Sequence, residues 1–204
     1  MEEVCKICMK PIKDHSFYSL FIKDNKICEE CFRKFSPKFI EFNIGIVKGL
    51  SIYEYDQEIK ELLFKFKGCF DYELKDVFLD RYLPYLRVRY HGYVIVPLPS
   101  YELDDEIRGF NHVESIYNRL NLPIYKIIRK TKRIKQSDQR QKERMKIGKH
   151  FTVKDLTKIT GKKVLIVDDI YTTGSSIQAA IDLLRKGKPR KIAVLVVAKN
   201  RFTG

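Results

Sequence analysis

Long apolar runs are absent from this sequence of 204 residues. No run approaches the roughly 18 to 20 apolar residues that a helix needs to span a bilayer. The first residues, MEEVCKIC, lack the basic flank and apolar core of a signal peptide. Internal repeats and low-complexity tracts are missing as well. These absences predict a cytoplasmic protein, and the length allows one medium domain with a small appendage, or two small domains.

Acidic residues are scarce relative to basic ones. Lys and Arg number 40 against 26 Asp and Glu, which gives a formal net charge of +14. The segment 126–163 holds 15 basic and three acidic residues, so it carries +12 of this charge. Such a field attracts polyanions, either a pyrophosphate group or a nucleic-acid backbone. A solvated lysine-rich surface without a ligand is the alternative that the sequence leaves open.

The cysteines are five in number, and four of them form two CxxC pairs, Cys5 with Cys8 and Cys28 with Cys31. Nineteen residues separate the pairs. At this spacing four thiolates can meet at one tetrahedral metal ion, and a cytoplasmic redox potential argues against disulfides. We therefore expect a structural zinc ion (Zn²⁺), with redox-active pairs or chance as alternatives.

The segment between the two pairs, FYSLFIKDNKI, is typical of two short strands joined at Asp24 and Asn25. That arrangement suits a zinc ribbon. A module of about 40 residues has too little core to fold alone, so the metal would supply much of its stability. The fifth cysteine, Cys69, stands among apolar and aromatic residues, and we expect it to serve packing.

The most informative motif is VLIVDDIYTTGSS, which covers residues 164–176. Its first four residues are continuously apolar, as in a strand covered on both faces of a parallel sheet, and we expect this strand to end at Asp168. Asp168 and Asp169 would then stand at the carboxyl end of the strand, where open α/β sheets bind ligands. Their carboxylates can accept hydrogen bonds from sugar hydroxyls.

The second half of the motif is suited to a phosphate. Its small residues offer backbone N–H groups and hydroxyls, and Gly174 permits close approach of the backbone. Either Ser175 or Ser176 can cap a helix expected over about 177–185, whose dipole would favour the phosphate. An ordinary turn with an acidic tip is the alternative. The proposed phosphate contacts are Thr172, Thr173, Gly174, Ser175 and Ser176.

The whole motif resembles the phosphoribosyl pyrophosphate (PRPP) motif of type I phosphoribosyltransferases. Elsewhere the chain alternates strand and helix patterns, which predicts a mainly parallel sheet. The expected strands are 51–55, 93–96 and 192–198, with an extended stretch at 123–128. The expected helices are 57–66, 72–88 and 111–120, and 136–146 is expected to be a loop or an exposed helix.

Taken in order, the cysteine pairs, the Pro-Leu-Pro-Ser loop at 97–100, the RGFN sequence at 108–111 and the PRPP motif resemble the ComF family. These are the late competence proteins, also called ComFC, of naturally transformable bacteria. The resemblance implies an α/β fold of the type I phosphoribosyltransferase kind, with a mainly parallel sheet and helices on both faces, preceded by a small zinc ribbon. It places the ribbon at residues 1–40 and the phosphoribosyltransferase-like domain at 45–204.

The resemblance also implies roles for single residues. Pro99 and Ser100 lie in the loop that resembles the pyrophosphate-binding loop, and Arg108 would contact an anion near it, although a surface arginine is the alternative. Gln136 and Arg144 fit the flexible catalytic loop. Asn111 is equally a helix N-cap. The chain departs from the family pattern at Arg133, where the family has Thr, at Ile147, where it has Asn, and at His112, where it usually has Gln.

The function implied is PRPP binding with Mg²⁺, in a protein that handles incoming single-stranded DNA. A DNA-uptake helicase or a translocation channel would be its partner. Two alternatives stay open: an active phosphoribosyltransferase, with Asp168, Asp169 and Arg108 as catalytic residues, and a PRPP-sensing regulator that binds nucleic acid without catalysis. No acceptor pocket is recognisable, so the zinc segment or residues 36–90 would supply it. Aromatic residues that could stack with bases are Tyr53, Tyr55 and Tyr101.

Overall fold

The fold is described from a computed structural model, which covers residues 4–12, 26–100, 102–130 and 151–201. The strands are β1 (Ile40–Ile44), β2 (Val47–Glu54), β3 (Tyr93–Pro97), β4 (Ile128–Lys130), β5 (Phe151–Val153), β6 (Lys163–Tyr171) and β7 (Lys191–Lys199). The α-helices are α1 (Glu29–Lys34), α2 (Gln57–Gly68), α3 (Leu83–Arg89), α4 (Glu102–Arg108), α5 (His112–Tyr117) and α6 (Ser175–Arg185). Short 3₁₀ helices are η2 (Tyr72–Val77), η3 (Asp80–Tyr82), η4 (Asn118–Leu120) and η7 (Leu156–Ile159).

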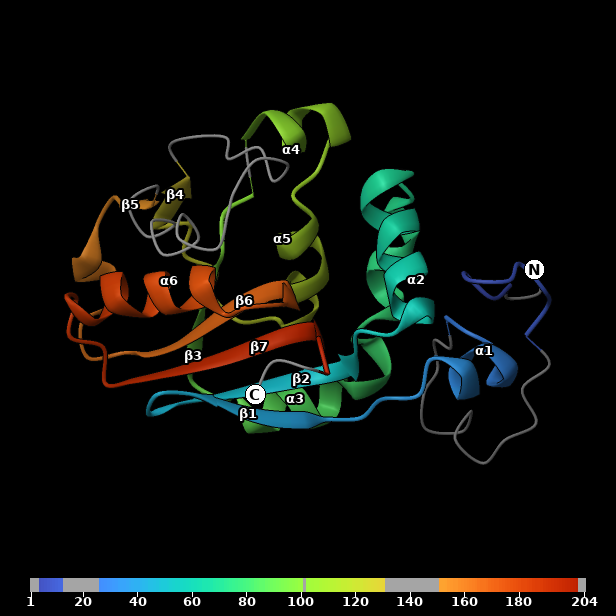
Figure 1. The fold of residues 1–204 in the computed structure, drawn as a ribbon, viewed down its shortest axis with the longest axis horizontal. Helices are drawn as coiled ribbons and strands as arrows, with labels where there is room; N and C mark the ends of the chain where they lie inside the picture. The colour runs from blue at the N-terminus through green and yellow to red at the C-terminus, as the bar shows by residue number, and fades with distance from the viewer. Residues whose placement is uncertain (1–3, 13–25, 101, 131–150, 202–204) are drawn as a thin grey trace.

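The centre of the fold is a five-stranded sheet in the order β1-β2-β7-β6-β3. Only the β1–β2 pair in this sheet is antiparallel, whereas β2–β7, β7–β6 and β6–β3 are parallel. The arrows of β2, β6 and β7 accordingly point the same way in Figure 1. The predicted mainly parallel sheet is confirmed.

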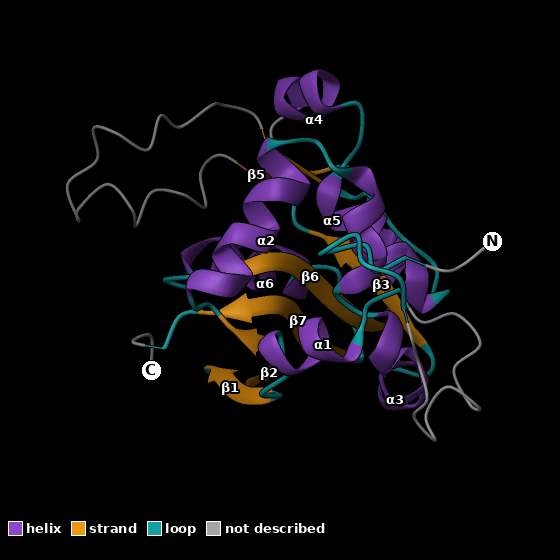
Figure 2. Ribbon diagram, turned by 90° about the vertical axis from the view of Figure 1, so that its right-hand side faces the viewer, coloured by secondary structure: helices purple, strands orange, loops and turns teal. Residues whose placement is uncertain are grey.

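Alternation along the central strands supplies both faces of the sheet with apolar side chains. Val164 and Ile166 in β6 pack into the cluster that includes Ile177 and Ile181 of α6. The residues between them pack into a larger cluster with α2, α3 and α5. Burial on both faces explains why the strand is continuously apolar. Helices therefore cover both faces, as Figure 2 shows.

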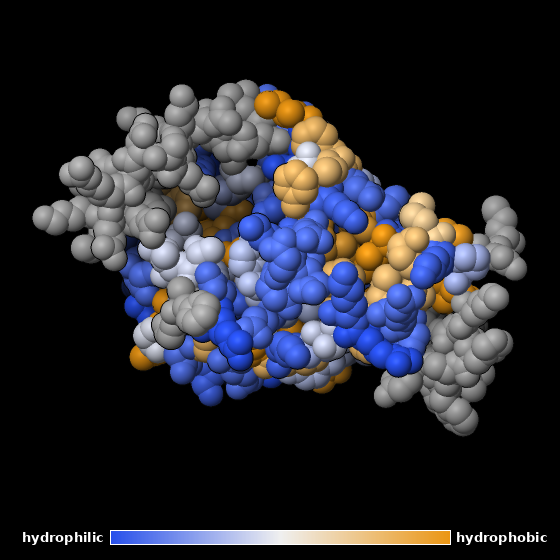
Figure 3. All heavy atoms as spheres, turned by 45° about the vertical axis from the view of Figure 1, so that its right-hand side comes forward, coloured by the Kyte–Doolittle hydropathy of each residue, from blue (hydrophilic) through white to orange (hydrophobic). Residues whose placement is uncertain are grey.

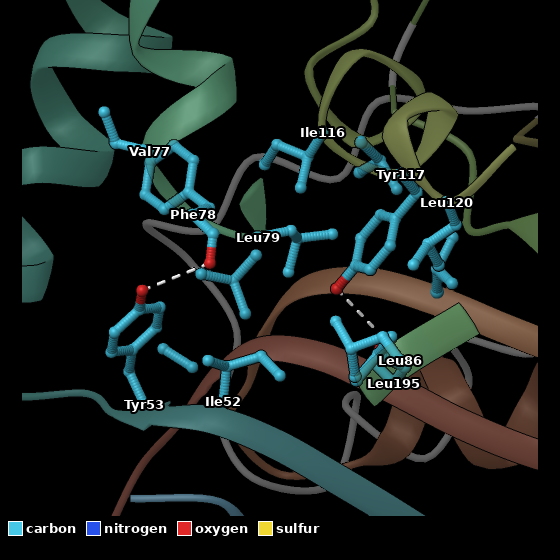
Figure 4. Packing of buried hydrophobic residues seen from close by; sticks show 14 of the residues in the cluster. Ile52, Tyr53, Val77, Phe78, Leu79, Leu86, Ile116, Tyr117, Leu120 and Leu195 are labelled. Carbon is cyan, nitrogen blue, oxygen red and sulfur yellow. Dashed lines mark hydrogen bonds between the residues drawn. The ribbon is translucent and has the colours of Figure 1, made fainter. Parts of the chain in front are cut away.

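The larger cluster joins segments that are distant in the chain (Figure 4). The side chain of Tyr53 in β2 is buried, and its hydroxyl donates to the carbonyl oxygen of Phe78 at 3.1 Å. Tyr117 in α5 is also fully buried, with its hydroxyl 3.1 Å from the Leu195 carbonyl oxygen and 2.8 Å from that of Asp168. These bonds satisfy buried phenols that would otherwise be costly. They also tie α5 to the strand that carries the acidic pair.

The helix α2 follows directly from its sequence. Asp56 caps it by accepting a hydrogen bond from the Ile59 backbone N–H at 2.9 Å. The apolar residues at helical spacing face the sheet, and burying each contributes about 1.5–3 kcal/mol. The helix ends at Gly68, where the sequence predicted a break. Its buried residues are Ile59, Leu62, Leu63 and Phe66.

The N-terminal segment packs against the rest of the molecule. Cys5, Ile27 and Cys31 belong to the larger apolar cluster. The Lys6 ammonium forms an ion pair with Asp76 of η2 at 2.7 Å. The expected hairpin lies mostly outside the described residues, and the division into residues 1–40 and 45–204 stays a prediction.

Three local expectations were wrong. The strand β6 does not end at Asp168 but continues to Tyr171, because Ile170 and Tyr171 still pair with β7. The expected helix over 72–88 is broken into η2, η3 and α3, with the non-helical residue Leu79 before η3 (φ −123°). The helix after the PRPP motif begins at Ser175, and its N-cap is Gly174 without a capping side chain.

Within the part of the chain that the structure describes, no helix combines the length and the apolar character needed to cross a membrane.

Candidate functional site

The acidic pair lies in the part of β6 that extends beyond the end of the neighbouring strand β3. The last residue of β3, Pro97, pairs with Val167, so Asp168 and Asp169 lie beyond the end of β3. On the other side, Asp168 pairs with Val196 of β7. The pair is thus at the carboxyl edge of the sheet, beside the loop 97–100, as the motif predicted.

Asp169 is held by two side chains from opposite parts of the chain. The Lys67 ammonium, near the end of α2, forms an ion pair with its Oδ2. The His112 Nε2 lies 3.2 Å from the same oxygen. Asp169 also accepts a hydrogen bond at Oδ1 from the backbone N–H of Ile170 at 2.7 Å.

The second ring nitrogen of His112 defines its protonation pattern. Arg108 NH1 lies 3.1 Å from His112 Nδ1. A guanidinium can only donate, so Nδ1 accepts, and the ring proton is on Nε2, facing Asp169. A neutral imidazole therefore connects the guanidinium to the carboxylate. The tautomer follows from these hydrogen bonds.

The pKa values of the two acids are shifted in opposite directions. Burial and the neighbouring Asp169 charge raise the pKa of Asp168 well above its ordinary value. Burial would raise the pKa of Asp169 as well, but the Lys67 charge and the His112 hydrogen bond hold it below its ordinary value. At neutral pH Asp169 is therefore ionised. Opposite shifts in adjacent carboxyls are typical of functional sites.

The RGFN segment is joined to the loop 97–100 by a network of hydrogen bonds. Asn111 Nδ2 donates to Ser100 Oγ at 2.9 Å and to Asp105 Oδ2 at 2.7 Å, and Ser100 also donates to Asp105. Arg108 NH1 donates to Asp105 Oδ1 at 2.9 Å. The Asn111 Oδ1 accepts from the Glu114 backbone N–H at 2.9 Å, so Asn111 is also the N-cap of α5. With only 12% of its side chain exposed, Arg108 is no simple surface arginine.

The turn after β6 brings the chain from the acids into α6. Gly174 has φ +71°, a conformation that side chains with a Cβ rarely adopt. A Cβ at this position would lie 2.8 Å from Tyr171 Cζ, so the turn also depends on close packing. Thr173 Oγ1 and Ser175 Oγ lie 3.0 Å apart. Thr172 and Thr173 are exposed, and their hydroxyls are available to a ligand.

These elements border one cleft of about 550 Å³, which we call the acidic cleft. It brings together six of the predicted site residues: Pro99, Ser100, Arg108, Asp168, Asp169 and Ser176. Four others, Thr172, Thr173, Gly174 and Ser175, belong to the same turn but not to its lining. Gln136, Arg144 and Tyr101 lie outside the described residues.

Two lysines, one histidine and two aromatic residues complete the acidic cleft, and most of them were missed as site residues. Lys67, His112 and Lys130 line it with Phe64 and Phe151. Lys67 carried a weak signal, because lysines alternate with phenylalanines over residues 64–67. That alternation fits a half-buried element as well as a phosphate contact. His112 directly follows the RGFN sequence, and it stood out in the sequence only because the family usually has Gln at this position.

Two other predictions about side chains were wrong. Tyr53 cannot stack with a base, because it is buried and bonded to Phe78. Cys69 is exposed rather than packed, because it follows the last turn of α2 at the surface.

The four paired cysteines converge as their spacing predicted. Their Sγ atoms all lie within 4.8 Å of one another, and Cys8 and Cys28 are 3.7 Å apart. Four thiolates around one tetrahedral Zn²⁺ have sulfur atoms about 3.8 Å apart, given Zn–S bonds near 2.3 Å. Cys5 and Cys31 are buried, while Cys8 and Cys28 are partly exposed. The cluster is therefore suited to hold a metal ion.

Backbone donors prepare one of these thiols for deprotonation. Burial would raise the pKa of Cys5, but hydrogen bonds from backbone groups of Cys8, Cys28 and Ile7 lower it to about 7. Burial and the neighbouring thiols raise the pKa of Cys31. A cation would relieve this crowding of thiols, since metal ligands are thiolates.

Comparison with known proteins agrees with this geometry. Residues 106–203 match the model of the phosphoribosyl transferase domain. The competence protein ComFC of Bacillus subtilis is 26% identical over 97% of this chain and 78% of its own length. The ComFC protein of Streptococcus pneumoniae is 27% identical over 94% of this chain and 78% of its own.

Among solved structures, hypoxanthine phosphoribosyltransferase of Staphylococcus aureus matches with a TM-score of 0.41 and 17% identity. The match covers 61% of this chain and 62% of that one.

The parallel sheet, the acidic pair at its carboxyl edge and the matching domain model define a protein with a type I phosphoribosyltransferase fold. The similarity to ComFC extends beyond this domain over nearly the whole chain. The chain belongs to the ComF/ComFC family.

Proposed function

We propose that this chain binds PRPP with Mg²⁺ in the acidic cleft. The observation that carries the proposal is the presence in one cleft of two adjacent acids, Asp168 and Asp169, and of cationic side chains suited to a pyrophosphate. The start of α6 borders the same cleft through Ser176. A phosphate there would gain backbone donors and the positive end of the helix dipole.

Each part of PRPP has a suitable set of partners. Asp168 and Asp169 accept from the ribose hydroxyls, and Thr172, Thr173, Gly174, Ser175 and Ser176 bind the 5′-phosphate. The loop with Pro99 and Ser100 receives the pyrophosphate, where Arg108 and Lys130 offset its charge. Mg²⁺ prefers oxygen ligands and, when bound, would neutralise charge between the pyrophosphate and ribose oxygens.

A catalytic role is the second candidate, favoured by the ionised state of Asp169 beside the cations. An acceptor's lone pair forms the bond to C1 of the ribose, and the C1–O electron pair leaves with pyrophosphate. The acceptor's proton passes to water. Asp168, Asp169 and Arg108 then act by holding the sugar and stabilising the leaving group's charge. Gln136 and Arg144, which fit the family's catalytic loop, are proposed to contribute as well and lie outside the described residues.

The biological setting that we propose is natural competence, where the protein handles incoming single-stranded DNA in the cytoplasm. The ComFC relatives and the net charge of +14 support this setting. A DNA-uptake helicase or a translocation channel is the proposed partner. The cysteine cluster holds structural Zn²⁺, for which the sulfur spacing provides support.

Titration calorimetry of PRPP with Mg²⁺ into the full chain tests the first proposal. We expect binding that the double variant Asp168→Asn, Asp169→Asn loses. Asp182→Asn is the matched control, because Asp182 is an exposed acid of α6 that binds Gln178 and lies outside the acidic cleft. Equal affinity in the double variant would refute the site.

Two further measurements separate the functions. Repeating the titration with a single-stranded oligonucleotide tests linkage, because a changed PRPP affinity would show coupling between the ligands. A steep loss of oligonucleotide binding with added salt would support the DNA role. Steady release of pyrophosphate in the presence of an acceptor would establish catalysis, and a strong preference for one duplex sequence would favour a regulator instead.

A further inference from the structure

A second cleft, of about 570 Å³, adjoins the acidic cleft at the carboxyl edge of the sheet. We call it the α2 cleft, because one face of that helix forms its longest wall. Tyr55 borders it just after β2, and Ile170 borders it near the end of β6. Its volume falls within the range of sites for small ligands, about 300–1,000 Å³. Its place at the carboxyl ends of parallel strands is where open α/β sheets bind ligands.

The two clefts share a wall. Phe64 and Lys67 line both of them. Ile170, in the lining of the α2 cleft, directly follows Asp169, and its backbone N–H donates to that carboxylate at 2.7 Å. A ligand in the α2 cleft is therefore a direct neighbour of a ligand held by Asp169.

Phe64 presents an aromatic ring at this boundary. Its residue is 65% exposed, although the apolar residues around it in α2 are buried. The ring packs against Gly68, where an added Cβ would lie 2.9 Å from the Phe64 Cε2. A glycine inside a helix costs about 1 kcal/mol relative to alanine. The glycine leaves room for the ring in this position, where one face is free to stack with a flat ligand.

The polar lining of the α2 cleft favours an anionic ligand. Lys60 and Lys65 border it, and neither forms a salt bridge with any residue that the structure describes. The acidic side chain in this lining, Glu61, accepts a hydrogen bond from Gln57 at 2.9 Å. Apart from the shared Lys67, the cleft thus offers two unpaired ammonium groups against one carboxylate. On the side of the molecule drawn in Figure 3, hydrophilic residues cover much of the surface, with patches of apolar residues among them.

We propose that the α2 cleft binds a planar aromatic or heteroaromatic ring that bears a carboxylate. The ring stacks on Phe64, its carboxylate lies near Lys60 and Lys65, and its free edge faces the acidic cleft. The assignment of this ring as the acceptor rests on the proposed function, in which PRPP occupies the acidic cleft. Residues 57–70, inside the region 36–90, would then supply the acceptor pocket that the sequence did not reveal.

The test uses 2-aminobenzoate, a fluorescent ring with a carboxylate, and 2-aminobenzamide, its uncharged analogue. The chain contains no Trp, so protein emission interferes little with either probe. Fluorescence anisotropy of each probe is measured with the full chain, with and without PRPP and Mg²⁺. We expect aminobenzoate to bind more tightly than aminobenzamide, and this preference to disappear in the double variant Lys60→Gln, Lys65→Gln.

Two variants test the position of the ring. Phe64→Ala should weaken aminobenzoate binding about five- to one-hundredfold, the range expected for one stacked ring. Cys69→Tyr should block the α2 cleft, because Cys69 lines it, while PRPP binding measured by calorimetry continues, because Cys69 does not line the acidic cleft. Val88→Ala, an 80% exposed apolar residue of α3 outside both clefts, is the control.

The possible outcomes separate this inference from the proposed function. PRPP binding without any aminobenzoate binding would overturn the inference alone. Aminobenzoate binding that Cys69→Tyr abolishes supports the inference, and absence of PRPP binding in the same protein would refute the proposed function alone. Displacement of the probe by a single-stranded oligonucleotide but by no free carboxylated ring would overturn the inference in favour of a nucleic-acid base.

Discussion

The Lys67 ammonium forms an ion pair with Asp169, a residue 102 positions further along the chain. The two side chains are 26% and 11% exposed, so water screens the pair only partly. The pair joins the end of α2 to the carboxyl edge of the sheet. It also favours the ionised form of Asp169, which can accept hydrogen bonds from hydroxyls of the proposed ligand.

Exchanging each acid for asparagine should change stability in opposite directions. Asp169→Asn leaves Lys67 without its partner and should lower the free energy of unfolding at pH 7 by about 1–3 kcal/mol. Asp168→Asn removes a poorly solvated carboxyl and keeps an oxygen to accept from the Asp169 backbone N–H, so it should raise stability by about 0.5–1 kcal/mol. Urea denaturation measures both, and a similar loss in both variants would contradict the opposite pKa shifts.

The changes in stability caused by Asp169→Asn and by Asp168→Asn should also disappear over different pH ranges. Asp169 has a lowered pKa in the folded state, so its stabilisation is present above the unfolded value, near 3.8, and is lost as the pH falls below it. Asp168 has a raised pKa, so the folded state takes up its proton first and the gain from Asp168→Asn disappears at a higher pH. Denaturation of the three proteins between pH 7 and 2.5 checks this order. An advantage of Asp168→Asn that lasts down to pH 3 would contradict it.

Gly174→Ala should disturb the turn at residues 172–176, which we call the phosphate turn because of its proposed role, more than its backbone conformation alone explains. An alanine in the left-handed region costs about 1–2 kcal/mol, and here its Cβ would also press on the Tyr171 ring. We expect lower stability and at least tenfold weaker PRPP binding. Gly161→Ala is the matched control, because Gly161 has a similar φ of +70° with nothing within 4 Å of the added Cβ. Equal effects of the two variants on PRPP affinity would argue against the phosphate turn.

Replacing Cys28 and Cys31 with serine should release the metal and lower the melting temperature. Two of the four sulfur ligands disappear, and Cys31 is part of the apolar cluster. Metal content per chain and thermal denaturation are the measurements. Cys69→Ser serves as the control, because that exposed thiol lies outside the cluster and should change neither value. Full metal content in the double variant would refute the site.

Much of the fold could be predicted because it depends on short-range patterns. The apolar run before Asp168 predicted a strand buried on both faces, and the spacing in α2 predicted a helix with one buried side. The CxxC pairs predicted four sulfur atoms in one place. In each case the local geometry of the strand, the helix or the CxxC pair follows from the spacing of a few residues.

Contacts between residues that are distant in the chain could not be predicted from the sequence. The extension of β6 to Tyr171 depends on pairing with β7. The burial of Tyr53 depends on the position of Phe78, whose carbonyl oxygen accepts a hydrogen bond from the Tyr53 hydroxyl. The identity of the residues that hold Asp169 depends on where α2 and α5 cross the sheet edge. None of these contacts produces a periodic pattern in the sequence.

By itself, the sequence determined the strand, the two acids and the turn of the candidate site, since these lie within 13 consecutive residues. Only the tertiary structure decided that Lys67 and His112 hold Asp169 and that a second cleft opens beside it. The physical reason is the strand order β1-β2-β7-β6-β3, which brings the helix after β2 to the end of β6. Such neighbours are set by the packing of whole elements, and no local pattern of residues encodes them.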